Sequence, residues 1–222
     1  VVRALEERWI PGGSQLHRST CVILDVDADA ETAATGPHDA NSRTLGIEWL
    51  RDGGIVGLGG AAYPAADKLA GAAPVRALVL NGAECEPYIS CDDMLMREAA
   101  EDILEGGRML ADLVGAPAIL VAIERDKPGA LESMQGAAHA SGDPRIRVVG
   151  IPSIYPAGGE RQLVALLTGT EIPGERYPSE VGYPCHNVGT ALAVQRWVSA
   201  RLPLTSRIVT VTGGGVAAPC NV

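Results

Sequence analysis

The sequence predicts an α/β fold in which a mostly parallel sheet is flanked by helices. Short apolar segments at residues 75–80, 118–123 and 146–151 alternate with segments whose apolar residues have helical spacing. This rhythm is typical of strand–helix–strand units. A chain of this length can bury about 70% of its unfolded surface in one core. Because Phe is absent, that core must consist mainly of Ala, Val, Leu and Ile.

Residues 1–45 are expected to form an N-terminal strand followed by an acidic linker. The strand is placed at residues 21–26, Cys-Val-Ile-Leu-Asp-Val. Asp25, Asp27 and Asp29 resemble the start of a calcium loop. The turn glycine and the final glutamate of such a loop are missing, so we interpret the segment as a solvated acidic loop.

Residues 46–200 are expected to form the main α/β domain. Its predicted elements are, in order, a helix ending near residue 51, a short helix at 64–69, a strand at 75–80, a helix beginning at Ser90, a strand at 118–123, a helix at 128–140, a strand at 146–151, and helices at 159–167 and 190–200. The helix from Ser90 has a weak point at Gly106-Gly107, because glycine lowers helix propensity. Residues 169–187 are rich in Pro and Gly and predict a loop. A last strand, at 207–212, opens a further unit over residues 201–222.

The glycine-rich segment before the strand at 75–80 predicts a ligand-binding loop. Gly57, Gly59 and Gly60 lack side chains, so a phosphate or a ring can approach the backbone amides closely. Lys68, one of only two lysines in the chain, adds a positive charge nearby. The segment is no P-loop, because no Ser or Thr follows a Gly-Lys pair, and it precedes a strand, unlike the dinucleotide fingerprint. The alternative is a simple connector.

An acidic turn follows the strand. Asn81-Gly82 is a turn signal, and Glu84 and Glu86 come directly after it. In open α/β sheets, ligands bind at the carboxyl ends of the strands. Two carboxylates beside a lysine and a glycine loop can accept hydrogen bonds from ribityl or ribose hydroxyls and from ring N–H groups. The alternative is a solvated acidic loop.

Five motifs, in order, resemble the C subunit of the Rnf ion-translocating electron transport complex and, more distantly, the flavin-binding subunit of respiratory complex I. They are Gly54-Ile-Val-Gly-Leu-Gly-Gly-Ala, Asn81-Gly-Ala-Glu-Cys-Glu-Pro-Tyr-Ile-Ser-Cys-Asp-Asp, Tyr155-Pro-Ala-Gly-Gly-Glu-Arg-Gln-Leu, His186-Asn-Val-Gly-Thr and Val209-Thr-Val-Thr-Gly. They extend over roughly residues 46–215, and each alone is modestly specific.

The resemblance implies a complex I flavin-subunit-like domain that holds FMN non-covalently. The implied FMN-binding residues are Gly57, Gly59, Gly60, Lys68, Asn81, Glu84, Gly158, Gly159, Glu160, Asn187 and Thr190. The resemblance places NADH, the substrate, near Tyr63 and Glu86. Residues 201–222 would be the start of a truncated β-grasp-like module of the SLBB type, poorly anchored by itself.

The implied function is that of an NADH-oxidising, electron-input flavoprotein, in which FMN carries the hydride transfer and no side chain is catalytic. Electrons would pass to iron–sulfur centres and indirectly to ferredoxin, through the other subunits of a membrane-bound complex. The protein would lie peripherally on the cytoplasmic face of the bacterial inner membrane. Alternatives are a cobalamin reductase-type flavoprotein of the same family and a non-catalytic assembly module that binds flavin or a partner.

Two departures from the family are visible. The family usually has Gly-Phe-Pro where this chain has Ala62-Tyr63-Pro64, and the extra methyl of Ala62 is expected to tighten the loop. The family also carries [4Fe-4S] clusters, but none of the five cysteines here forms Cys-x-x-Cys, so we expect this chain to ligate no metal.

Composition excludes several other classes. The net charge of −9 disfavours a nucleic-acid groove. No apolar run approaches the roughly 20 residues of a membrane span, and no N-terminal segment has the layout of a signal peptide. We therefore expect no direct membrane insertion.

Overall fold

The computed structural model describes residues 2–12, 15–25, 46–70 and 74–222. The expected acidic linker, with Asp27 and Asp29, lies outside these residues. The chain divides into two compact units, residues 1–33 and 34–222, and each is described by itself.

The N-terminal unit is an antiparallel hairpin of β1 (Val2–Gly12) and β2 (Gln15–Leu24). The sequence predicted only one strand, at 21–26, so half of this unit was missed. Leu5 and Val22 are directly opposite each other in the register and both are exposed. The hairpin is hard to recognise from the sequence because its apolar side chains are exposed. The alternation of apolar and polar residues that marks a half-buried strand therefore does not reveal it.

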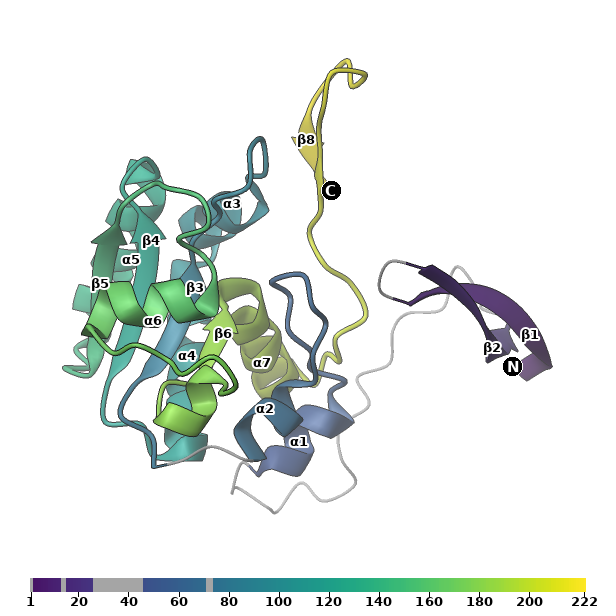
Figure 1. Ribbon diagram of the computed structural model, residues 1–222, viewed down its shortest axis with the longest axis horizontal. Coiled ribbons are helices and arrows are strands. Elements are labelled where there is room, and N and C mark those ends of the chain that lie inside the picture. Colours follow the sequence, from purple (N-terminus) through teal and green to yellow (C-terminus); the bar gives the residue numbers. More distant parts are fainter. Residues whose placement is uncertain (1, 13–14, 26–45, 71–73) are drawn as a thin grey trace. The chain divides into compact units, whose positions relative to one another are not determined.

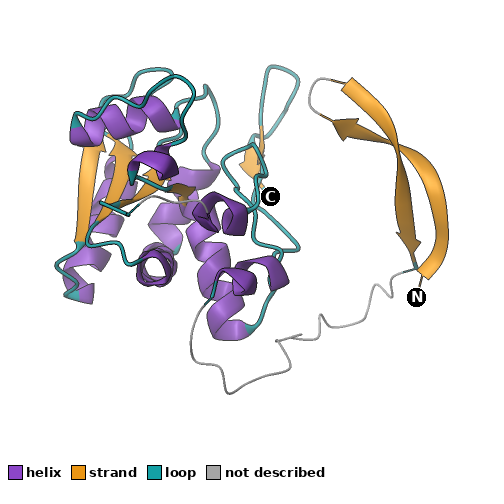
Figure 2. Ribbon diagram, turned by 60° about the horizontal axis from the view of Figure 1, so that its bottom comes forward, coloured by secondary structure: helices purple, strands orange, loops and turns teal. Residues whose placement is uncertain are grey.

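The second unit is the predicted α/β domain. Its sheet has the order β5-β4-β3-β6, and all three pairings are parallel. Figures 1 and 2 show this sheet enclosed by helices. The strands are β3 (Leu78–Gly82), β4 (Ile119–Glu124), β5 (Ile146–Ile151) and β6 (Cys185–Asn187). The helices are α1 (Ile47–Asp52), α2 (Ala65–Ala70), α3 (Cys91–Glu98), α4 (Ala100–Val114), α5 (Pro128–Ser141), α6 (Glu160–Thr168) and α7 (Val188–Ala200), with a short 3₁₀ turn at Pro178–Val181.

Side-chain alternation divides the core into two layers. Leu78 and Leu80 of β3 belong to the larger cluster, which includes buried residues of α4, α5 and α7. Val79, between them, belongs to the smaller cluster with Leu163 and Val164 of α6. Successive side chains of a strand point to opposite faces, so α6 covers one face and α4, α5 and α7 cover the other. Figure 1 shows α6 in front of the strands.

Several predicted boundaries were wrong. The strand placed at 75–80 begins only at Leu78 and includes the Asn81-Gly82 pair that was predicted to be a turn. The amides of Arg76 and Ala77 bond to the Gly182 carbonyl instead of joining the ladder. Strand β6 lies inside the segment predicted to be a loop, because a three-residue strand shows no periodicity.

The helix predicted from Ser90 is two helices, and the break is at Ala99. The helix continues without interruption through Gly106-Gly107, the predicted weak point. A Cβ atom at Gly106 would lie 1.8 Å from the Ala191 carbonyl oxygen of α7. Glycine is therefore present here because two helices approach closely, and their packing outweighs its low helix propensity.

The strand in the C-terminal segment is shorter than predicted. Of residues 207–212, only Thr210–Val211 (β7) is a strand, paired antiparallel with Cys220–Asn221 (β8). Nevertheless it bonds to the domain: the Leu204 amide donates to the Gly53 carbonyl at 2.9 Å. None of the described helices has the length and apolar character needed to cross a membrane.

Candidate functional site

The glycine loop, residues 57–63, is closed at its base and open at its tip. Val56 and Pro64 form a bridge, and the Gly57 amide donates to the Tyr63 carbonyl at 2.8 Å. Thr190, fully buried on α7, accepts a hydrogen bond from the Leu58 amide at 2.9 Å. The base of the loop is therefore fixed by hydrogen bonds, whereas its tip is exposed.

The tip presents free backbone donors. Gly59 and Gly60 are exposed, and within the described part of the chain their amides have no hydrogen-bond partner. Gly60 has φ +114°, which L side chains rarely adopt. Unpaired amides without flanking side chains suit an anionic or planar ligand.

Ala62 and Tyr63 complete the loop. Ala62 has φ +50°, so the residue that departs from the family's glycine sits in the left-handed region where a Cβ is strained. The Tyr63 side chain is 53% exposed and offers an aromatic face to solvent.

Asn81 and Asn187 lie side by side where β3 and β6 end. They are register partners in the parallel ladder. Asn81 Nδ2 donates to the Gly158 carbonyl at 2.9 Å, and its Oδ1 accepts from the Ala83 amide at 3.0 Å. Asn187 Oδ1 caps α7 by accepting from the Gly189 amide at 2.8 Å. The two amides thus join the acidic turn, the 158–160 turn and α7 at one edge of the sheet.

Lys68 and Glu160 meet at the same edge. Lys68 Nζ pairs with Glu160 Oε1 and donates to the Cys185 carbonyl at 2.6 Å. The Lys68 side chain is only 22% exposed and that of Glu160 37%. The ammonium therefore links α2 to α6 and β6 through two of its three protons, and its third proton is left as a donor.

Glu84 and Glu86 differ in their surroundings. Glu84 is buried, and its carboxylate accepts from the Asp92 and Asp93 amides at 3.0 and 3.2 Å. It therefore caps α3, where the helix dipole favours a negative charge. Glu86 is exposed. The Glu84 amide donates to Glu124 Oε2 at 3.2 Å, and burial raises the pKa of that Glu124 carboxyl.

Asp92 is a site residue that the sequence reasoning missed. Its Oδ2 accepts from Asn187 Nδ2 at 2.6 Å. Burial raises the pKa of Asp92 to about 6, the Asn187 hydrogen bond opposes this, and Glu84 reinforces it. The sequence feature that could have indicated Asp92 is its position in the first turn of the helix that begins after Ser90, beside the acidic turn.

His186 lies buried beneath this edge. Its Nε2 is a buried atom without a hydrogen-bond partner in the described structure. Burial and, to a smaller extent, the charge of Lys68 lower the pKa of His186 to about 3. The imidazole is therefore neutral at physiological pH, and burial also raises the pKa of the neighbouring Cys185 thiol.

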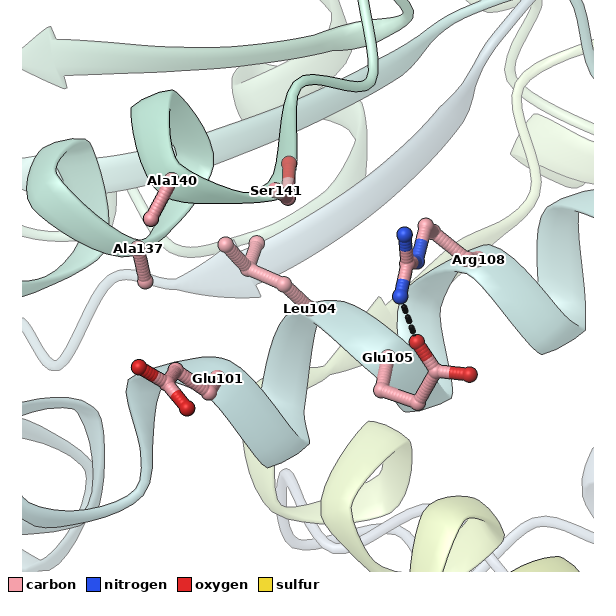
Figure 3. A pocket seen from close by; sticks show the side chains of 7 residues that line it. All are labelled: Glu101, Leu104, Glu105, Arg108, Ala137, Ala140 and Ser141. Atoms are coloured by element: carbon pink, nitrogen blue, oxygen red, sulfur yellow. Dashed lines mark hydrogen bonds and ion pairs between the residues drawn. The ribbon is translucent and has the colours of Figure 1, made fainter.

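A hollow of about 230 Å³ borders the acidic turn. It is lined by the last residue of β4 and by residues that follow β3, β4 and β5, namely Glu84, Cys85, Glu86, Pro87, Tyr88, Ile89, Glu124, Asp126, Lys127, Ser153, Ile154 and Tyr155. A second hollow of about 240 Å³ lies between α4 and α5, where Arg108 pairs with Glu105 (Figure 3). None of the residues lining the second hollow was predicted to bind a ligand.

The structure brings most of the predicted residues to one edge. Those joined there by hydrogen bonds or by the loop itself are Gly57, Gly59, Gly60, Lys68, Asn81, Glu84, Gly158, Glu160, Asn187 and Thr190. Gly159 is the residue just before α6. Tyr63 and Glu86 lie on the loop and the turn, and no contact between described residues joins them to each other. Among the described residues, no three His, Cys, Asp or Glu are grouped so as to hold a metal ion.

The fold and this edge place the chain in a known class. A profile of the Nuo51 FMN-binding domain matches residues 50–196, and the chain belongs to that family. The edge described above lies within the matched region.

Individual relatives indicate which kind of protein within this family the chain is similar to. The C subunit of the ion-translocating oxidoreductase complex of Pseudomonas aeruginosa is 49% identical over 79% of this chain and 23% of that protein. The protein of the same name from Pectobacterium carotovorum subsp. carotovorum is 44% identical over 100% of this chain and 30% of that protein. The chain thus spans less than a third of the length of these relatives.

Solved structures give the same fold. The crystal structure of NAD⁺-reducing [NiFe]-hydrogenase in the air-oxidized state matches with a TM-score of 0.61 and 26% identity, over 68% of this chain and 30% of that chain. The H2-reduced state of that enzyme matches with a TM-score of 0.57. The predicted α/β class, with a parallel sheet flanked by helices, is confirmed.

Proposed function

We propose that this chain binds FMN non-covalently and forms the electron-input part of an NADH-oxidising flavoprotein. The supporting observation is the convergence of the glycine loop, Lys68, Asn81, Glu160 and Asn187 at one edge of a parallel sheet. Ligands of open α/β sheets bind at this edge. Membership of the FMN-binding family makes a flavin the ligand class to test.

The residues present fit a phosphorylated, planar group. The amides of Gly59 and Gly60 are unpaired donors in the described structure, and Lys68 supplies a nearby cation. A Cβ at Gly158 would come within 3.2 Å of the Ala83 carbonyl oxygen and 3.3 Å of Cys85 Sγ, so a side chain there would fit only if its neighbours moved slightly.

We assign the proposed holding roles by chemistry. The glycine-loop amides and Lys68 hold negative charge, while Asn81, Glu160 and Asn187 offer groups that bond to hydroxyls and ring N–H atoms. Glu84, whose oxygens are used by α3, acts by shaping the acidic turn. Thr190 acts by fixing Leu58. Bound FMN supplies a ring that takes up a hydride and releases electrons singly.

NADH is the proposed substrate, and Tyr63 and Glu86 are its proposed contacts. Both side chains are exposed, so both are free to meet a nucleotide. An aromatic face stacks on a nucleotide ring, and a carboxylate accepts from ribose hydroxyls. A 2′-phosphate near Glu86 meets like-charge repulsion, so NADH is preferred to NADPH.

The wider role follows the curated relatives. In this proposal the chain is part of the C subunit of an ion-translocating complex, held by other subunits at the cytoplasmic face of the inner membrane. Electrons leave towards iron–sulfur centres and finally ferredoxin. The β-grasp-like identity of residues 201–222 and the division at residues 45 and 200 belong to the same proposal.

The test is a titration of the purified chain with FMN, followed by anaerobic addition of NADH or NADPH. Quenching of flavin fluorescence measures binding, and loss of visible flavin absorbance measures reduction. We expect saturable binding and a lower half-saturating concentration for NADH than for NADPH. A chain that binds no FMN contradicts the proposal. A chain that binds FMN but is reduced by neither nucleotide supports the non-catalytic assembly module instead.

A further inference from the structure

Residues 204–222, named here the C-terminal clasp, touch both halves of the candidate site. At one end, Arg207 Nη2 donates to the Leu58 carbonyl of the glycine loop at 3.1 Å, and the Leu204 amide donates to the Gly53 carbonyl at 2.9 Å. In addition, the Leu58 amide donates a hydrogen bond to Thr190 Oγ1. Leu58 is therefore bonded through both its amide and its carbonyl.

The other end of the clasp holds the start of α3. The Ser90 amide donates to Thr210 Oγ1 at 3.1 Å. Asn221 Nδ2 donates to the Ser90 carbonyl at 3.2 Å, and its Oδ1 accepts from Thr210 Oγ1 at 2.7 Å. Ser90 ends the acidic turn, so the β7–β8 pair bonds directly to the segment that carries Glu84 and Glu86.

We propose that the C-terminal clasp keeps the glycine loop and the acidic turn in their ligand-ready positions, with Arg207 as the positioning residue. This inference rests on the proposed function only for the identity of the ligand. The two halves of the site belong to separate segments, residues 57–63 and 83–90, and no hydrogen bond between described residues joins the glycine-loop backbone directly to residues 83–90. The clasp is a link that bonds to both.

Charge supports the same role for Arg207. Burial raises the pKa of Asp92, and the guanidinium of Arg207 is among the groups that lower it again. Asp92 in turn accepts from Asn187. Arg207 thus stabilises the ionised carboxylate between the acidic turn and β6, in addition to bonding to the Leu58 carbonyl.

Hydrogen exchange of the ligand-free protein tests the clasp without any flavin. The Gly57 and Leu58 amides are both bonded in the described structure, so their exchange reports opening of the glycine loop. Arg207→Ala should speed exchange in residues 57–63 severalfold, and Arg207→Lys should restore most of the protection. Arg147→Ala, which removes an exposed arginine from β5, is the control. Unchanged exchange in Arg207→Ala would overturn the inference.

FMN titration then tests the consequence for binding. A charged hydrogen bond at an exposed site predicts a loss of about five- to tenfold in affinity for Arg207→Ala. Arg207→Lys should remain within about twofold of the parent. Asn221→Ala, at the other end of the clasp, should also weaken binding, whereas Cys220→Ser, its exposed neighbour, should not.

The outcomes separate the two proposals. If the parent chain binds no FMN but Arg207→Ala still speeds exchange of the loop, the proposed function fails and the clasp stands. If the parent binds FMN and Arg207→Ala binds equally well, the clasp fails and the proposed function stands. An Arg207→Lys variant as weak as Arg207→Ala would show that the positive charge is not what positions the loop.

Discussion

Lys68 is the candidate-site side chain that joins α2 to α6 and β6. It pairs with Glu160 and bonds to the Cys185 carbonyl. Lys68→Ala removes a cation and leaves the Glu160 carboxylate without its partner. We expect FMN binding to weaken by roughly 10- to 150-fold, since a hydrogen bond to a charged group is worth about 1.5–3 kcal/mol. Flavin fluorescence quenching measures the change.

The chain contains its own control for this substitution. Lys127, the other lysine, pairs with Asp126 and Glu124 and is assigned no flavin contact. Lys127→Ala should leave the FMN dissociation constant within about twofold of the parent. Equal losses in both variants would mean that Lys68 acts only through net charge.

Ala62 carries backbone strain that a single methyl group causes. Its φ of +50° costs an L residue roughly 1–2 kcal/mol relative to a relaxed backbone. Ala62→Gly should therefore raise the free energy of unfolding by about 1 kcal/mol in urea titrations. Ala61→Gly, next to it and without positive φ, should lower the free energy of unfolding by roughly 0.4–1 kcal/mol. A destabilised Ala62→Gly protein would contradict the strain.

Among the secondary-structure elements, α4 and α7 make the closest approach that the described structure has at a glycine. Gly106→Ala would place a Cβ 1.8 Å from the Ala191 carbonyl oxygen. Either helix must shift, so we expect a loss of about 1–3 kcal/mol or more in the free energy of unfolding. Thermal or urea unfolding measures it.

Gly136 on α5 is the matched control, because a Cβ there meets nothing within 4 Å. Gly136→Ala should stabilise the protein by about 0.8–1 kcal/mol, the difference in helix propensity. If both variants were stabilised, the close approach of α4 and α7 would be wrong.

Over the whole molecule, half-buried Asp92 and buried His186 give stability opposite dependences on pH. The pKa of Asp92 is raised to about 6 from an ordinary value of 3.8. Its protonated form is favoured in the folded state, so the contribution of Asp92 to stability is greatest below pH 4 and falls as pH rises towards 6. The pKa of His186 is lowered to about 3 from 6.5, so stability is lost as pH falls below 6.5.

The substitution Asp92→Asn isolates the first effect, because asparagine still accepts from Asn187. We expect the variant to gain stability relative to the parent by about 2–3 kcal/mol between pH 4 and 6, with a constant difference above pH 6. Urea unfolding at several pH values measures this. A difference that does not change with pH would show that Asp92 is not buried with a raised pKa. His186 is untouched in this comparison, so its own pH dependence cancels.

The central elements were predictable because local patterns and tertiary packing agree there. The strand at 146–151 has the predicted limits, and the helix from Pro128 ends one residue later than predicted. The order of the candidate-site motifs was likewise readable, because each motif is a contiguous run of residues in the sequence. Family membership of residues 50–196 agrees with the order of these motifs.

The sequence by itself determined the α/β class, the position of most helices and strands, and the residue types of the candidate site. Tertiary structure alone decided how they are used. Glu84 became a cap of α3 instead of a free carboxylate, and Gly106 became a point of contact with α7 instead of a helix break. Asp92, near the end of the second motif, and Arg207, outside the five motifs, joined the site through hydrogen bonds to other segments. Periodicity records which face of an element is buried, but hydrogen bonds between segments distant in sequence leave no local pattern.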